Sequence, residues 1–249
     1  MSKLQALIFD VDGTLADTER DGHRVAFNQA FAEAGLDWDW SVDLYGELLS
    51  VTGGKERIHF YAQQYLPDTQ MPSDELIADL HIAKTKYYRE LLALGKIPLR
   101  TGVKRLIQEV RSQGIRLAIA TTSALPNVSA LLEKNLDPSW FEVIAAGDIV
   151  LAKKPAPDIY YYVLESMNLE SQDCLVVEDS HHGLQAAVGA DLRTIVTVNE
   201  YTKNQDLSAA LLVLNHLGEP DLPCNILSGD AMNIKYLDVK TLNYIHSLN

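Results

Sequence analysis

The stretch LQALIFDVDGT, residues 4–14, decides the expected fold because an apolar run, interrupted only by Gln5, leads into two acidic residues and a glycine. A short run that is apolar at nearly every position is typical of a strand covered on both faces, so we expect a strand over Leu4–Phe9. Alternation along an extended chain places Asp10 and Asp12 on the same side. Two such carboxylates make an acid–base pair or a site for a hard cation, although Asp and Gly are also ordinary turn residues.

Four more short apolar runs follow, separated by segments with helical spacing. The runs are Ile115–Ala120, Val143–Ala146, Cys174–Val177 and Thr194–Val198. The helical segments are Val103–Gln113, Asn127–Lys134, Pro157–Asn168 and Gly183–Ala190. Strands that alternate with helices in this way predict an α/β fold with a doubly wound parallel sheet.

One region breaks the alternation. From about Thr18 to Leu94 the chain has helical periodicity and no convincing strand. We therefore expect a small all-helical cap inserted after the first strand, at the carboxyl edge of the sheet, where open α/β sheets bind ligands. The expected division is a core of residues 1–16 and 95–249 and a cap of residues 17–94.

The composition excludes several classes of partner. The 249 residues are 47% hydrophobic, enough for one large domain with an insertion, and carry a formal net charge of −13. This charge repels nucleic acid and anionic lipid, and it also repels a phosphorylated substrate unless a metal ion and lysines reverse the field locally. Two cysteines, Cys174 and Cys224, are expected to be unpaired thiols.

The expected location is the cytoplasm. No apolar stretch approaches the roughly 18 residues of a membrane span. The amino end enters a strand at once, which leaves no room for a signal peptide. A plastid location would require a transit peptide removed from a precursor.

Three further motifs follow predicted strands. In VEDS, residues 177–180, the acidic pair could meet Asp10 across the cleft and complete an oxygen-ligand set for Mg²⁺, or it could simply cap the next helix. In TTS, residues 121–123, a hydroxyl and nearby backbone amides could hold a phosphoryl oxygen. In KKPAPD, residues 153–158, a lysine before proline is a candidate fixed cation, although adjacent lysines are often solvated.

Together these motifs follow the order Asp-x-Asp-x-Thr, Thr/Ser, Lys-Pro and Glu-Asp, so the chain resembles the haloacid dehalogenase superfamily of hydrolases. The resemblance implies a Rossmann-like core and an aspartyl-phosphate intermediate on Asp10. It implies that Asp12 is the general acid and base, and that Thr121 and Lys154 hold the phosphoryl oxygens. The Mg²⁺ ligands would be Asp10, Asp12 through its backbone carbonyl, and Asp179, with Glu178 close by. The second aspartate favours phosphoryl transfer over dehalogenation.

The predicted cap contains VTGGKERI, residues 51–58, in which paired glycines and two cations stand at a helix start. This pattern suits an anion site or an ordinary helix–helix turn. It resembles the cap signature of the CbbY branch, beside β-phosphoglucomutase, whose members are phosphatases of xylulose-1,5-bisphosphate. The resemblance implies substrate contacts at Asp17, Thr52, Gly53, Gly54, Lys55, Arg57 and Thr122. Lys86 is expected on a solvated helix face.

The leading hypothesis is therefore a monomeric Mg²⁺-dependent phosphatase of small sugar bisphosphates. A phosphomutase of the β-phosphoglucomutase type shares every core motif and differs in how well water reaches the aspartyl-phosphate. A non-catalytic protein that uses the same fold for binding is a third hypothesis. It is disfavoured because Asp10, Asp12, Lys154 and Asp179 are all present.

Overall fold

The computed structural model describes residues 3–51, 53–67, 70–229 and 234–248. The chain divides into two compact units, one formed by Met1–Asp17 with Pro98–Asn249 and the other by Thr18–Ile97. We call them the α/β unit and the helical unit and describe each by itself.

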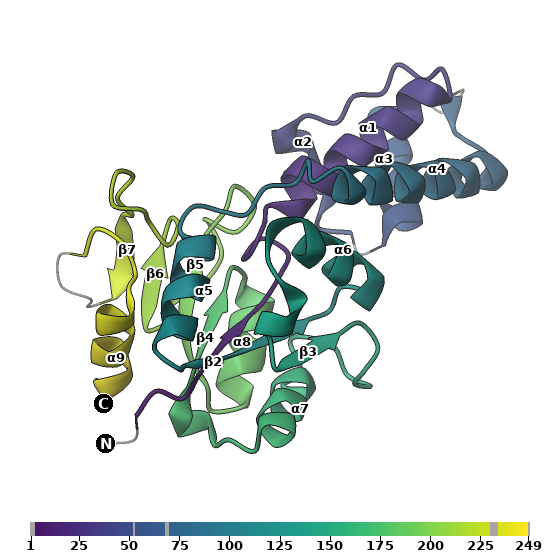
Figure 1. Cartoon of the computed structure of the whole chain (residues 1–249). Coiled ribbons are helices and arrows are strands. Elements are labelled where there is room, and N and C mark those ends of the chain that lie inside the picture. Colours follow the sequence, from purple (N-terminus) through teal and green to yellow (C-terminus); the bar gives the residue numbers. More distant parts are fainter. Residues whose placement is uncertain (1–2, 52, 68–69, 230–233, 249) are drawn as a thin grey trace. The chain divides into compact units, whose positions relative to one another are not determined.

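The α/β unit contains a seven-stranded sheet in the order β3-β2-β1-β4-β5-β6-β7 (Figure 1). Its strands are β1 (Ala6–Phe9), β2 (Arg116–Thr121), β3 (Val143–Ala146), β4 (Cys174–Glu178), β5 (Arg193–Thr197), β6 (Leu212–Leu214) and β7 (Ile226–Gly229). Neighbouring strands are parallel except β6 and β7, which are antiparallel. The strand order reverses at β1, between β2 and β4, and ligands bind at such a switch point. The parallel α/β fold expected from the sequence is thus confirmed, with two further strands at one edge.

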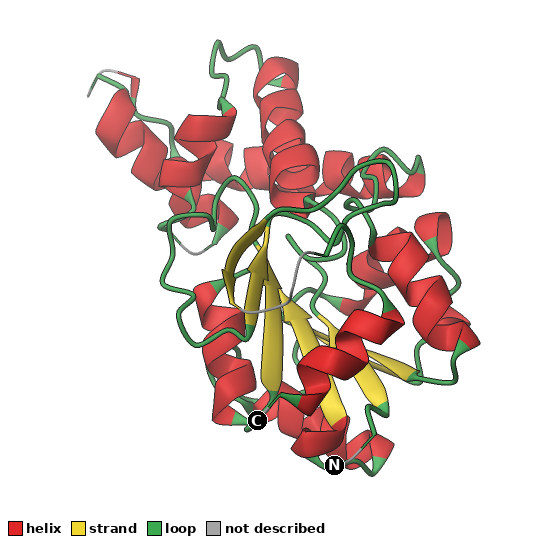
Figure 2. Ribbon diagram, turned by 90° about the vertical axis from the view of Figure 1, so that its left-hand side faces the viewer, coloured by secondary structure: helices red, strands yellow, loops and turns green. Residues whose placement is uncertain are grey.

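Helices cover both faces of this sheet (Figure 2). They are α5 (Val103–Ser112), α6 (Leu125–Asn135), α7 (Asp158–Met167), α8 (His181–Gly189) and α9 (Val239–Ser247), with short 3₁₀ turns at Pro138–Trp140 and Ser171–Asp173. Apolar side chains of α7 and α8 form one core with Ala6 and Ile8 of β1. Because side chains alternate along a strand, Leu7 and Phe9 face the opposite side, and they are fully buried as well. Burial on both faces explains why the β1 sequence is apolar throughout.

The carboxyl-terminal segment completes the α/β unit. Helix α9 packs against α5. The segment also supplies β7, whose antiparallel pairing covers the edge of β6. A four-residue strand with mostly exposed side chains has no continuous apolar run, so the pattern that marks the central strands is missing there.

The helical unit consists of α1 (Arg24–Glu33), α2 (Val42–Leu48), α3 (Gly54–Tyr65) and α4 (Asp74–Ala93), preceded by a π-helical turn at Thr18–His23. Its core is aromatic, and the rings in mutual contact are those of Phe27, Phe31, Trp38, Trp40, Tyr45 and Tyr61. Helix α4 packs along α1 and α3. Ser41 and Ser73 cap α2 and α4 by accepting hydrogen bonds from Leu44 and Leu76 backbone N–H groups.

Two smaller expectations can be compared with the structure. Cys174 and Cys224 are both buried free thiols, which confirms that prediction. Among the described residues, no helix has the length and apolarity needed to cross a membrane.

The aromatic core predicts a large loss of stability in the Trp40→Ala variant. Trp40 is fully buried, so its removal should lower the free energy of unfolding of the helical unit by about 3–5 kcal/mol. Urea unfolding followed by far-UV circular dichroism measures the loss. The half-buried Trp140, which lies 4.4 Å from the Arg111 guanidinium in the α/β unit, is the matched control. Equal losses in Trp40→Ala and Trp140→Ala would contradict the prediction.

Candidate active site

The register of the central strands brings the sequence motifs to one edge of the sheet. Phe9 of β1 lies opposite Ile119 of β2 and Val177 of β4. The Asp10 backbone N–H continues the ladder by donating to the Val177 carbonyl at 3.0 Å. Side chains just beyond these three strand ends therefore surround one point.

Three carboxylates meet at that point. Asp10, Glu178 and Asp179 each offer an oxygen atom, and these atoms lie within 4.8 Å of one another. The three residues are 7%, 1% and 6% exposed, which removes them from the solvent that would otherwise screen their charges. Buried carboxylates need compensation by a cation. An all-oxygen set of this kind fits a hard divalent cation such as Mg²⁺ or Ca²⁺.

Lys154 supplies one positive charge to the cluster. Its Nζ donates to Asp10 Oδ1 at 2.7 Å, to Glu178 Oε1 at 2.6 Å and to the Ala120 carbonyl at 2.8 Å. Burial alone would lower the pKa of this ammonium group, but Asp10 and Glu178 hold the pKa well above its usual value. The Tyr160 hydroxyl also donates to Glu178 Oε1, at 2.6 Å. Lys154 is therefore a fixed buried cation, whereas Lys153 is exposed and paired with Asp148.

Burial and mutual proximity shift the pKa values of these carboxyl groups. Burial raises the pKa of Asp10 well above its ordinary value, Lys154 lowers it, and Glu178 raises it further. Burial and the neighbouring Glu178 raise the pKa of Asp179 to about 7, against the opposing effect of Arg100. One lysine does not neutralise three carboxylates, so a bound divalent cation would be strongly favoured here.

Asp12 and the residues after β2 lie beside this cluster. The Ser123 hydroxyl donates a hydrogen bond to Asp12 Oδ2. Thr121 is buried at the end of β2, and its Oγ1 accepts from the Ser123 backbone N–H at 3.1 Å. Thr122, which we expected to contact substrate, is exposed. Ser123 is the residue of this motif that orients Asp12, a role that the sequence alone did not assign.

Glycine is required directly after Asp12. Gly13 has φ = +86°, and a Cβ built on it would lie 2.2 Å from Asp179 Oδ2 and 2.6 Å from Asn199 Nδ2. The loop after β1 therefore packs its backbone against a carboxylate of the cluster. Asp17, at the end of the same loop, forms an ion pair with Arg100 Nε at 3.2 Å.

Some of the substrate contacts predicted from the sequence lie in the helical unit. Thr52 lies outside the described residues. Gly53 has φ = +99° and precedes α3, which begins at Gly54. Lys55 in the first turn of α3 is exposed. An exposed lysine therefore stands at a helix start, a combination suited to an anion, although the Glu56 carboxylate lies close to Gly53.

Arg57, a further predicted substrate contact, lies two residues after Lys55 on α3. It is buried, and its guanidinium donates to the Leu48 carbonyl at 3.1 Å, the Val51 carbonyl at 3.2 Å and the Tyr45 hydroxyl at 2.9 Å. Residues two apart on a helix point to different sides, so Lys55 and Arg57 do not share a face. Arg57 holds the connection between α2 and α3 in place.

Sequence reasoning missed a basic cluster formed by Lys55, His81 and Lys84. A Cβ on Gly54 would lie 2.6 Å from the His81 ring, and the charges of Lys84 and Lys55 add to burial in lowering the pKa of His81. Lys84 Nζ lies 4.9 Å from the Phe27 ring centroid, and burial lowers its pKa to about 8. Lys86 is exposed, as expected.

The cluster had a signal in the sequence. Buried positions of α4 are Ile77, Leu80, Tyr88 and Leu92, spaced by three, four or eight residues. Lys84 falls on this apolar stripe, where a lysine is unusual.

The raised carboxyl pKa values predict that the metal-free protein loses stability as pH rises. The folded Asp179 has a pKa of about 7 against 3.8 for an ordinary aspartate, so the folded state binds more protons across this interval. Stability is then greatest at low pH within the window and falls as pH approaches the folded pKa. Urea unfolding with a chelator from about pH 5.5 to about pH 7.5 tests this, and Asp179→Asn should flatten the decline. Stability that rises with pH in this window would contradict the prediction.

Comparison with known proteins agrees with this geometry. Residues 4–191 match the family model of a haloacid dehalogenase-like hydrolase. The plasmid-encoded CbbY of Cupriavidus necator is 48% identical over 225 residues, covering 88% of each chain. CbbY of Rhodobacter capsulatus is 50% identical over 211 residues, covering 84% of this chain and 91% of the relative.

Solved structures give the same result. A mutant CbbY of Rhodobacter sphaeroides in complex with xylulose-(1,5)bisphosphate superposes with a TM-score of 0.71 at 45% identity, covering 86% of this chain and 94% of that one. These matches confirm the predicted fold class and the predicted class of enzyme, a phosphoric monoester hydrolase. The chain belongs to the haloacid dehalogenase-like hydrolases.

Proposed function

We propose that this chain is a Mg²⁺-dependent phosphatase that transfers a phosphoryl group from a small sugar bisphosphate, with xylulose-1,5-bisphosphate as the expected substrate, through Asp10 to water. The observation that carries the proposal is the buried Asp10 carboxylate, bound by Lys154 within a cluster of three carboxylates. Asp12 stands two residues further along the chain and is held by Ser123. A nucleophile beside a separate proton donor is what a two-step phosphoryl transfer requires.

In the first step, an Asp10 oxygen attacks phosphorus and the bond from phosphorus to the sugar oxygen breaks. The Asp12 carboxyl group gives its proton to the leaving oxygen. In the second step, Asp12 takes a proton from water, whose oxygen attacks phosphorus, and the bond to Asp10 breaks. Inorganic phosphate is released, Asp10 is ionised again and Asp12 is protonated again, so atoms and charge balance.

The remaining core residues hold the phosphoryl group. Lys154 and Thr121 are placed to bind its oxygens and to offset the charge that develops in the transition state. Mg²⁺, held by Asp10, the Asp12 carbonyl and Asp179 with Glu178 close by, would supply further positive charge to the phosphoryl oxygens. The donor set favours this ion because its side-chain ligands are carboxylate oxygens.

Binding of a second phosphate is assigned to the helical unit, which we propose acts as the cap predicted over residues 17–94. The exposed Lys55 and its neighbour Lys84 supply positive charge in a chain whose net charge is −13. The His81 ring beside them, whose pKa is lowered, can add a hydrogen-bond donor. The amides around Thr52, Gly53 and Gly54 would add hydrogen-bond donors. Binding energy from the remote phosphate can then orient the phosphate that reacts.

Further roles are proposed for Arg57, Asp17 and Thr122. Arg57 would hold the segment before α3 in place by donating to the Leu48 and Val51 carbonyls. Substrate contacts at Asp17 and Thr122, a monomeric state and a cytoplasmic location remain expectations from the sequence.

Phosphate release from xylulose-1,5-bisphosphate, measured beside a panel of sugar mono- and bisphosphates, tests the proposed function. We expect Mg²⁺-dependent release with a preference for the bisphosphate, and a loss of about a thousandfold or more in Asp10→Asn. Asp148→Asn removes an exposed carboxylate from the loop after β3 and should leave the rate unchanged. Isomerised monophosphate in place of inorganic phosphate would show the phosphomutase activity instead.

Lys84 gives a separate prediction about substrate preference. Lys84→Met should raise KM for the bisphosphate by about tenfold or more, because a charge-assisted contact to phosphate is lost, with little effect on a simple monophosphate ester. Lys86→Met is the matched control on the exposed side of α4. Because the pKa of Lys84 is about 8 before substrate binds, its charge is present below that pH and lost above it. KM for the bisphosphate should therefore rise above about pH 8 in the wild type and not in Lys84→Met. Equal effects of the two variants would contradict the assignment.

A further inference from the structure

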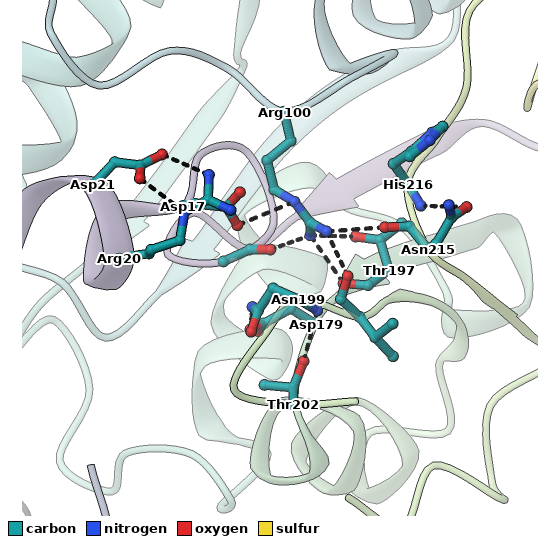
Figure 3. A network of polar contacts seen from close by, with 12 residues as sticks. Asp17, Arg20, Asp21, Arg100, Asp179, Thr197, Asn199, Thr202, Asn215 and His216 are labelled. Atoms are coloured by element: carbon teal, nitrogen blue, oxygen red, sulfur yellow. Dashed lines mark hydrogen bonds and ion pairs between the residues drawn. The ribbon is translucent and has the colours of Figure 1, made fainter. Parts of the chain in front are cut away.

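Arg100 forms the densest set of polar contacts around the loop after β1 (Figure 3). Its side chain is 8% exposed and pairs with Asp17. Nη1 donates to the Gly13 carbonyl and, at 2.9 Å and 3.0 Å, to the carbonyl and hydroxyl oxygens of Thr197. Nη2 donates to the carbonyl of Val198 at 2.5 Å and of Asn215 at 3.1 Å. One guanidinium therefore joins the loop after β1 to the ends of β5 and β6.

The backbone of Arg100 strengthens the same connection. Its N–H donates to the Leu15 carbonyl at 2.8 Å, and Leu99 forms an antiparallel bridge with Ala16. The chain segment that returns to the α/β unit is thus paired with the segment that leaves it. Arg100 fixes this pair of segments to the sheet.

These contacts lead directly to the carboxylate cluster. Gly13, whose carbonyl accepts from Arg100, follows Asp12 and packs against Asp179 Oδ2. Asn199 also contacts Asp179, because its Nδ2 donates to the same Asp179 oxygen at 2.7 Å. Asn199 is itself held in a turn, because its Oδ1 accepts from the Tyr201 N–H at 2.9 Å.

A lysine could not reproduce the contacts of Arg100. Its ammonium has three N–H donors around one atom, whereas the guanidinium presents five donors in a planar fork. Here the fork reaches acceptors on three separate segments. Loss of the fork would free the Gly13–Asp17 loop, and with it the Asp12 carbonyl and the backbone that confines Asp179.

We infer that Arg100 and Asn199 are positioning residues of the phosphoryl-transfer site, which set the Asp12 carbonyl and the Asp179 carboxylate for the divalent cation. The inference rests on the proposed function. Neither residue needs to touch substrate, since Arg100 acts through Gly13 and Asn199 acts through Asp179. Groups that orient metal ligands in this way contribute substantially to metal affinity.

The test measures Mg²⁺ binding to the full-length protein without substrate, by isothermal titration calorimetry, in Arg100→Lys, Asn199→Ala and Arg116→Lys. Arg116 is the matched control, because it pairs with Glu142 and donates to the Met167 carbonyl at 2.8 Å, but lies at the amino end of β2. We expect Mg²⁺ affinity to fall about tenfold or more in the first two variants and to stay within about twofold of wild type in the control.

Kinetics and stability separate positioning from general damage. With p-nitrophenyl phosphate, kcat at a fixed low Mg²⁺ concentration should fall in Asn199→Ala and recover as Mg²⁺ is raised, which a merely destabilised protein would not show. Urea unfolding identifies a variant that fails to fold. If Arg100→Lys does not fold, the Mg²⁺ affinity of Asn199→Ala decides whether the inference stands. Wild-type Mg²⁺ affinity in Asn199→Ala, or an equal loss in Arg116→Lys, overturns the inference. A wild type that neither binds Mg²⁺ nor releases phosphate overturns the proposed function and the inference together.

Discussion

Three carboxylates buried at the ends of two adjacent parallel strands are the constraint on which the rest of the site depends. Asp10 from β1 and Glu178 and Asp179 from β4 are brought together by strand register, and their mutual repulsion must be offset inside the protein. Lys154 enters the cluster from the loop after β3 and offsets part of that charge. The excess negative charge favours a bound divalent cation, and an aspartate beside such a cation suits the proposed phosphoryl transfer.

The two units gather charges of opposite sign. The α/β unit concentrates negative charge around a candidate cation site. A phosphate could bind there only where the ion and fixed cations offset that charge. The helical unit gathers positive charge from Lys55 and Lys84 near the start of α3, with the His81 ring beside them. Under the proposed function, the α/β unit would bind the phosphate that reacts and the helical unit would bind the phosphate used for recognition. This separation of charge would also explain how a chain with a net charge of −13 can use an anionic substrate.

The core of the site could be predicted from the sequence because residues that follow parallel strands lie at the same edge of the sheet. Once Leu4–Phe9 was recognised as a buried strand, Asp10 and the motifs after the later strands had to meet at one edge. Contacts that depend on side-chain direction were harder to predict. Arg57 is buried although its neighbours suggest a surface cation, and Lys84 is hidden in an apolar stripe. The side-chain contacts of Arg100 reach residues 83 (Asp17) to 115 (Asn215) positions away, so no local sequence pattern predicts them.

The central claim is that phosphoryl transfer passes through Asp10, and the stereochemical course at phosphorus tests it most directly. A phosphorothioate monoester made chiral at phosphorus with two oxygen isotopes would be hydrolysed in the presence of Mg²⁺, in water carrying the third isotope, and the configuration of the released inorganic thiophosphate determined. Two successive in-line displacements, first by Asp10 and then by water, predict net retention of configuration. Net inversion would show that water attacks the substrate directly, and would contradict the role assigned to Asp10.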